Sequence, residues 1–127
     1  MIDEQTVRFM MWSTSIAAGI VAAHFLIAEK EYRKFSFGLT GHFFVLSVHQ
    51  FYWWLSSRAF QDGDMALHDA IYSHRYIATT CELLMIGFTL FILEPALRRW
   101  FGTWWYAGGG AIGIVLYVAG KLTLAAQ

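Results

Sequence analysis

Four polar side chains recur every seven residues along one stretch of the chain: His68, Arg75, Glu82 and Thr89. Seven residues are close to two turns of an α-helix, so a continuous helix places all four on one face. The residues that follow Glu82 are almost all apolar, as in a membrane-spanning segment. A carboxylate is costly in such a segment and marks a functional position.

The element that must position these side chains is predicted to be one long helix over Asp64–Leu93. Asp64 is a typical N-cap residue, and Pro95 follows the far end. The second half, roughly Tyr76–Leu93, has the apolar character of a membrane span. We therefore expect this helix to begin outside a membrane and to end inside it.

The composition agrees with a membrane protein. The chain has 127 residues, of which 57% are hydrophobic and only 14% are charged, and its mean hydropathy is +0.46. A soluble domain carries about 25% charged residues. The formal net charge is zero, so we expect the lipid bilayer and not nucleic acid as a partner. The single cysteine, Cys81, excludes an intrachain disulfide and is expected to act as a small apolar residue.

Three further apolar stretches are long enough to cross about 30 Å of hydrocarbon. The sequence thus predicts an all-α membrane protein, a four-transmembrane-helix up-down-up-down bundle whose third helix extends beyond the bilayer. The whole chain, 1–127, is expected to be a single integral membrane domain, with spans at about 9–28, 35–55, 76–93 and 104–124. The predicted connections are Glu29–Lys34, Ser57–Gly63 and Glu94–Thr103.

Small residues form ridges on the first and fourth spans. Such ridges allow helix backbones to approach closely, within one chain or between copies. The alternative for the fourth span is that three consecutive glycines, Gly108–Gly110, loosen or kink the start of the helix. The ridge residues are Ser15, Gly19, Ala23, Gly109, Gly113 and Gly120.

Counting residues from the span ends brings two polar side chains to one depth. Glu82 lies six residues inside Tyr76, about 9 Å along the helix, and His49 lies six residues from Leu55. We expect Glu82 and His49 to form the polar centre of the bundle, with Arg75 one layer above. Their role is either to hydrogen-bond across helices and fix the packing, or to serve a function.

His24 and His42 form a second candidate layer, near the opposite interface. Two imidazoles at one depth on different helices would supply bis-histidine ligation of haem b. The alternative is that both histidines only stabilise packing. A metal site of Glu82, His49 and a third ligand is a further hypothesis, although the sequence contains no His-Glu-x-x-His or Glu-x-x-His motif.

The basic residues predict an orientation. Five of them lie in the first and third connections: Lys30, Arg33, Lys34, Arg98 and Arg99. The other side holds Arg58 and Arg75, with Arg8 and Lys121 near span ends. The positive-inside rule then places both termini outside the cytoplasm. The acidic start at Asp3 and Glu4 does not fit a secretory signal, and we expect an integral protein of a bacterial inner membrane.

No enzyme motif is present: the sequence lacks a glycine-rich phosphate loop, a Gly-x-Ser-x-Gly elbow and paired intramembrane carboxylates. Four spans with short connections resemble the compact holins and related small phage or bacterial membrane proteins. The resemblance implies a non-enzymatic, homo-oligomeric pore or lesion. Common holins often end in a basic tail, whereas this sequence ends in Leu124–Gln127. The alternative is an accessory subunit of a larger membrane complex, which would bind haem or pigment through the intramembrane histidines.

Overall fold

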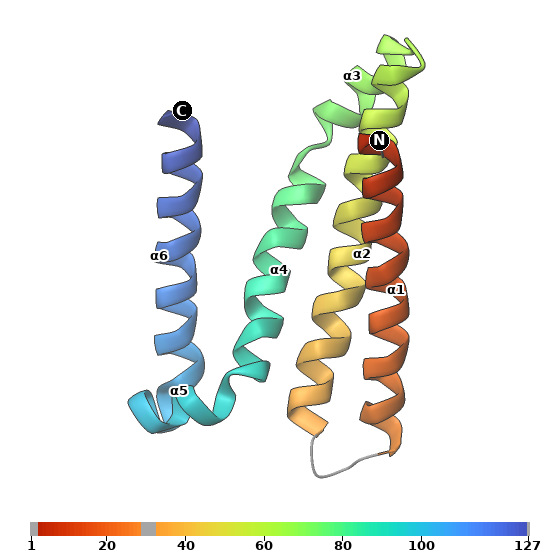
Figure 1. The fold of residues 1–127 in the computed structure, drawn as a ribbon. Coiled ribbons are helices and arrows are strands. Elements are labelled where there is room, and N and C mark those ends of the chain that lie inside the picture. Colours follow the sequence, from red (N-terminus) through yellow and green to blue (C-terminus); the bar gives the residue numbers. More distant parts are fainter. Residues whose placement is uncertain (1–2, 29–32, 127) are drawn as a thin grey trace.

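The computed structural model describes residues 3–28 and 33–126, and every regular element in these ranges is helical (Figure 1). Successive long helices run in opposite directions, so that the start of α1 and the end of α6 lie at the same end of the molecule. The prediction of an all-α fold is confirmed. The elements are α1 (Glu4–Ala28), α2 (Arg33–Gln61), α3 (Met65–Ser73), α4 (Tyr76–Ile92), α5 (Glu94–Phe101), the 3-10 helix η2 (Gly102–Trp104) and α6 (Trp105–Ala126).

Within the described ranges, two helical segments are long and apolar enough to cross a membrane, Glu4–Phe25 and Glu94–Ala126. The pair α3 and α4 becomes a third if its two helices are counted as one bent span. The four predicted spans are therefore confirmed only in part. Helix α2 has 29 residues and is about 43 Å long, which is enough length, but its serine, threonine and histidine side chains make it too polar.

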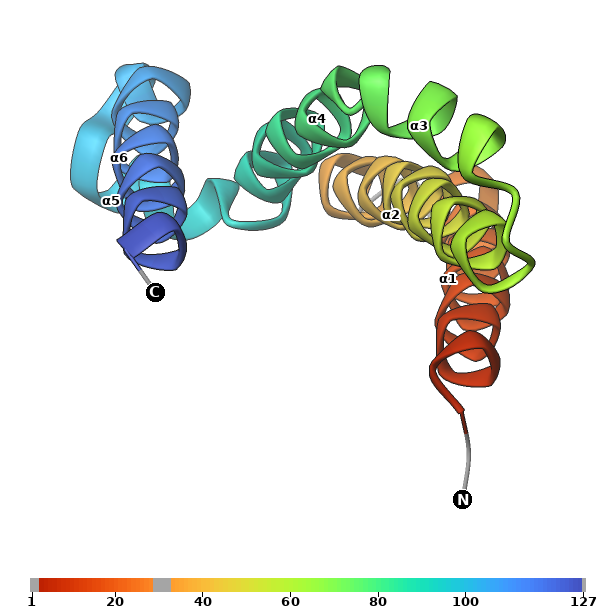
Figure 2. The ribbon, with the colours of Figure 1, turned by 90° about the horizontal axis from the view of Figure 1, so that it is seen from above.

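The helices form an open, curved row rather than a closed bundle. Viewed from above, α1, α2, α4 and α6 follow one another along an arc, and α1 and α6 occupy its two ends (Figure 2). Each of the inner helices contacts a neighbour on both sides, whereas α6 contacts α4, α5 and η2. Among the described residues, no large side chain is fully buried. The apolar contacts thus lie along seams between adjacent helices and not in one central core.

The predicted single helix over Asp64–Leu93 is wrong, because the chain bends by 45° between α3 and α4. At the bend, side chains form hydrogen bonds with backbone carbonyl groups that would otherwise accept the N–H groups of a continuous helix. The hydroxyl of Tyr52, on α2, donates to the carbonyl oxygen of Ile71 at 2.5 Å. Nδ1 of His74 lies 2.8 Å from the carbonyl oxygen of Ala70. Such competition with the backbone ladder is a known cause of helix breaks.

The turn before α3 is shorter than predicted. Helix α2 continues to Gln61, so the predicted loop Ser57–Gly63 is reduced to its last residues. Gly63 adopts a positive φ of 75°, which glycine accommodates without strain. Asp64 caps α3 as predicted: its carboxylate accepts the backbone N–H of Leu67 at 3.1 Å.

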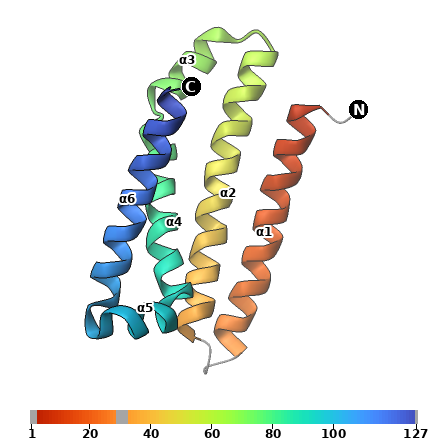
Figure 3. The same cartoon turned by 60° about the vertical axis from the view of Figure 1, so that its left-hand side comes forward.

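The prediction that Glu94–Thr103 is an irregular connection is also corrected, because most of this segment forms the short helix α5. Pro95 lies in the first turn, where its missing N–H costs nothing. Arg98 and Arg99 lie in the last turn, where positive charge favours the helix C-terminus. Gly102, with a φ of 61°, ends α5, and the chain turns into η2 and α6 (Figure 3).

Glycines set the spacing of the seams. A Cβ atom at Gly38 would lie 2.7 Å from the backbone oxygen of Phe88, and one at Gly41 would lie 2.2 Å from the Phe88 ring. These close approaches hold α2 against α4.

The predicted small-residue ridges are used within the chain. Ser15 and Gly19 are buried, and Gly19 faces Phe43 and Phe44 of α2; Ala23 is half-buried. On α6, Gly109 contacts Leu90 and Leu97, and Gly113 contacts Ile86. A Cβ atom at Gly120 would have no neighbour within 4 Å, so this glycine takes no part in the seam.

Candidate functional site

The carboxylate of Glu82 receives side chains from two neighbouring helices. The hydroxyl of Tyr117 donates to Oε2 at 2.7 Å, and Nζ of Lys121 lies 2.9 Å from the same oxygen. Nε2 of His49 lies 3.3 Å from Oε1. We call these four residues the Glu82 cluster. It joins α2, α4 and α6 through one carboxylate.

Helix geometry explains how the cluster forms. Tyr117 and Lys121 are four residues apart, so they lie on one face of α6. That face is turned to α4, and Nζ of Lys121 lies 5.5 Å from the centre of the Tyr117 ring. The Glu82 side chain is 20% exposed, whereas that of Lys121 is 50% exposed. The cluster therefore has an open side at Lys121.

His49 has two competing partners for one ring nitrogen. The indole Nε1–H of Trp53 points to Nε2 of His49 at 3.2 Å, and Oε1 of Glu82 faces the same nitrogen. An indole only donates, so Nε2 must be unprotonated to accept from Trp53 and protonated to donate to Glu82. Among the described residues, Nδ1 of His49 is buried without a hydrogen-bond partner. The position of the ring proton thus decides which neighbour His49 serves.

Arg75 lies beside the cluster without an ion pair to it among the described contacts. It precedes the first turn of α4, and its guanidinium carbon lies 5.0 Å from the centre of the Tyr72 ring. Arg75, Glu82 and Lys121 line one recess of about 450 Å³. The predicted layer above Glu82 is therefore part of the same open recess.

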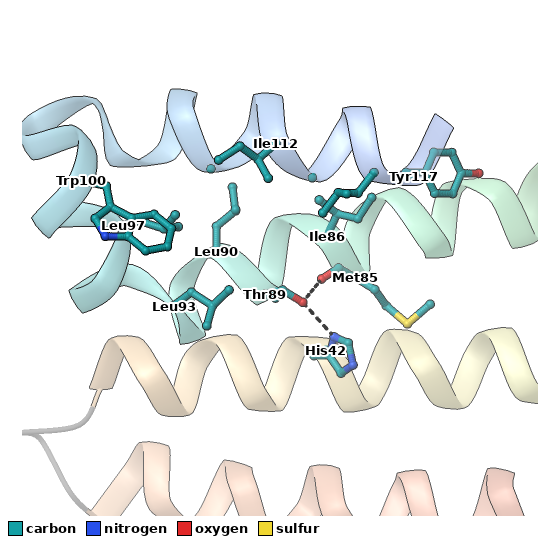
Figure 4. A pocket seen from close by; sticks show the side chains of 13 residues that line it. His42, Met85, Ile86, Thr89, Leu90, Leu93, Leu97, Trp100, Ile112 and Tyr117 are labelled. Atoms are coloured by element: carbon teal, nitrogen blue, oxygen red, sulfur yellow. Dashed lines mark hydrogen bonds between the residues drawn. The ribbon is translucent and has the colours of Figure 1, made fainter. Parts of the chain in front are cut away.

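The two remaining candidate histidines have different neighbours. Nδ1 of His42 lies 3.5 Å from Oγ1 of Thr89, which itself donates to the carbonyl oxygen of Met85 (Figure 4). His24 is exposed on α1 and packs against Phe25. No contact joins the two imidazoles in the described part of the chain. Haem binding through this pair stays a prediction.

Metal-binding side chains do not gather in the described ranges: no group of three or more histidine, cysteine, aspartate or glutamate residues could hold an ion there. Cys81 is buried next to Glu82 in sequence, without a disulfide partner. A metal site of Glu82 and His49 thus has no third ligand of these types in residues 3–28 and 33–126.

Sequence reasoning missed the α6 half of the cluster. Lys121 appeared as an interfacial charge near a span end, and Tyr117 was not singled out. The spacing of four residues on one helix face was the available signal. Comparison of the chain with family models, with curated proteins and with solved structures gives no match.

Proposed function

We propose that this chain is a non-enzymatic, holin-like membrane protein of bacterial or phage origin that assembles with copies of itself into a pore or lesion. It would act in the bacterial inner membrane with both termini outside the cytoplasm. The observation that carries the proposal is the open side of the Glu82 cluster. A half-exposed ammonium group paired with an intramembrane carboxylate favours water or another protein over lipid.

The open row supports the same conclusion. A compact bundle would enclose its charged residues, whereas α6 packs mainly against α4, α5 and η2 and the Lys121 side chain stays half exposed. Copies placed side by side could complete the ring that one chain does not close. Polar residues would then face a shared lumen, and the apolar residues on the outer face would contact lipid.

The first test is dye release and mass. The purified full chain is inserted into vesicles loaded with a fluorescent dye, and its mass in detergent is measured by light scattering. We expect more than one chain per particle and dye release that rises steeply with the protein-to-lipid ratio. A monomer that releases no dye would contradict the proposal and favour an accessory subunit of a larger complex.

Ion selectivity provides a sharper readout in planar bilayers. Lys121→Met leaves the carboxylate of Glu82 unbalanced, so the reversal potential in a KCl gradient should shift toward cation selectivity. Glu82→Gln should shift it in the opposite direction. Arg58→Gln is the matched control, because Arg58 is exposed near the end of α2 and pairs with Asp62. Equal reversal potentials in all three variants would place the cluster outside the conducting path.

A further inference from the structure

The two ends of the helix row carry opposite charge. The end that holds α5 and the start of α2 has four basic residues and one acidic residue among the described residues. At the opposite end, where α1 starts, α2 ends and α3 lies, acidic residues outnumber basic ones: Asp3, Glu4, Asp62, Asp64 and Asp69 against Arg8, Arg58 and Arg75. The described charged residues of the basic end are Arg33, Lys34, Glu94, Arg98 and Arg99.

Helix α5 collects the cations of this end. The guanidinium of Arg98 donates a hydrogen bond to one carboxylate oxygen of Glu94, and Nζ of Lys34 on α2 lies 3.4 Å from the same oxygen. Arg99 is exposed and forms no ion pair within the described part of the chain. One carboxylate thus faces two cations, with a third cation next to them. The surplus of positive charge attracts an anionic group.

Exposed tryptophans mark the same corner as a membrane interface. Trp100 on α5 is 73% exposed, and Trp104 in η2 is 67% exposed. Tryptophan side chains gather at the level of lipid headgroups, where the indole meets both hydrocarbon and water. The guanidinium carbon of Arg98 lies 5.7 Å from the centre of the Trp105 ring, which holds the charge at this level.

An apolar groove runs from this corner along α4 and α6. Its volume is about 590 Å³, which lies within the range of small-molecule sites. Figure 4 shows Leu97 and Trp100 of α5 at one end and Tyr117 near the other, with Leu90 and Ile112 between them. Apart from His42, Thr89 and Tyr117, the lining is apolar. Helix α5 therefore carries both the cations and one end of the groove.

We propose that this corner binds an anionic phospholipid, with the phosphate at Lys34, Arg98 and Arg99 and one acyl chain in the groove between α4 and α6. Positive charge at the headgroup level and an apolar channel leading from it match the two parts of such a lipid. The proposal is independent of pore formation, because a subunit of any membrane complex could hold the same lipid.

The test is native mass spectrometry of the full chain in detergent with phosphatidylglycerol and phosphatidylcholine of identical acyl chains. We expect retention of phosphatidylglycerol over phosphatidylcholine. Arg98→Gln with Arg99→Gln should reduce phosphatidylglycerol binding by roughly tenfold to thirtyfold, because each cation at a membrane surface contributes about 1 kcal/mol. Arg8→Gln with Arg58→Gln removes the same charge at the other end, where, among the described residues, both side chains pair only with a carboxylate four residues away, and should leave phosphatidylglycerol binding unchanged.

Two more variants separate the parts of the site. Arg98→Lys with Arg99→Lys keeps the charge and should keep the selectivity, with an unchanged circular dichroism spectrum. Ile112→Trp fills the groove and should weaken phosphatidylglycerol binding although all cations remain. Equal losses in the α5 double variant and its control would overturn the headgroup site. Full binding by Ile112→Trp would overturn the acyl-chain site.

Discussion

At the scale of single residues, Glu82 shows how an acidic side chain is accommodated between largely apolar helices. An isolated carboxylate there is strongly unfavourable. Tyr117 and Lys121 supply a hydroxyl donor and a positive charge to one oxygen, and His49 faces the other. Charge-assisted hydrogen bonds of this kind are stronger than neutral ones. Three helices are thereby tied to one side chain.

Substitution of Glu82 should separate hydrogen bonding from charge. Glu82→Gln and Glu82→Leu both remove the ion pair with Lys121, but Gln still accepts a hydrogen bond from Tyr117. We therefore expect Gln to be milder than Leu in the free energy of unfolding, measured by detergent titration. A double-mutant cycle between Glu82 and His49 should give a coupling of about 0.6–2 kcal/mol.

His42 provides the control for this cycle. It lies on the same helix as His49, but its ring contacts Thr89 and has no described contact with Glu82. The cycle between Glu82 and His42 should therefore be additive within about 0.5 kcal/mol. Additive free energies for Glu82 and His49 as well would mean that their 3.3 Å contact contributes nothing to stability.

Residue counting along the sequence found part of this site for a physical reason. The depth of a side chain follows from the helical rise, and this placed His49 level with Glu82. Depth alone does not predict the contact between Lys121 and Glu82, because Lys121 lies five residues from the end of α6, where a lysine side chain normally extends its charge to the interface. Which face α6 turns toward α4 depends on tertiary packing, which the sequence pattern does not encode.

At the scale of elements, the bend between α3 and α4 shows where periodicity fails. The seven-residue repeat treats His68 and Glu82 as parts of one helix face. In the structure, Nδ1 of His68 lies 3.2 Å from the backbone oxygen of Ser56 on α2, and α4 starts after the bend. The sequence alone can indicate Ser73 and His74 as local competitors for backbone carbonyl groups. It cannot indicate the hydrogen bond from Tyr52, because Tyr52 lies on another helix.

The glycines of α6 should be intolerant of bulk in proportion to their contacts. A Cβ atom would lie 2.6 Å from Leu97 at Gly109 and 2.7 Å from Ile86 at Gly113. Replacing both glycines by Leu should lower the free energy of unfolding by about 1–3 kcal/mol, the usual range for overpacking. Thermal unfolding in detergent, followed by circular dichroism, measures the change.

Gly120→Leu is the matched control in the same helix, because its Cβ position has no neighbour within 4 Å. We expect a change within about 0.5 kcal/mol. If Gly120→Leu were as harmful as the double variant, the loss would stem from the helix itself and not from the seam. If the double variant were as stable as the parent, the seam between α4 and α6 would not depend on close approach.

At the scale of the whole molecule, the sequence predicts which segments are helical better than how they close. Apolar runs identify most of the long helices, and Ser15, Gly19, Gly109 and Gly113 are buried or lie against a neighbouring helix. A hydrophobic pattern does not distinguish a residue that faces lipid from one that faces another helix, because both surroundings are apolar. An open row and a closed bundle therefore produce the same pattern.

The orientation of the row remains a prediction from charge. The basic end, with α5, should face the cytoplasm, because positively charged connections are retained on that side. A reporter fused after Gln127 should then be active outside the cytoplasm. A reporter inserted at Asp62–Gly63 should give the same side, since this turn and the end of α6 lie at one end of the row. Arg98→Glu with Arg99→Glu should weaken the preference of the α5 end for the cytoplasmic side. A cytoplasmic signal from a stable fusion at Gln127 would show that the orientation is the opposite one.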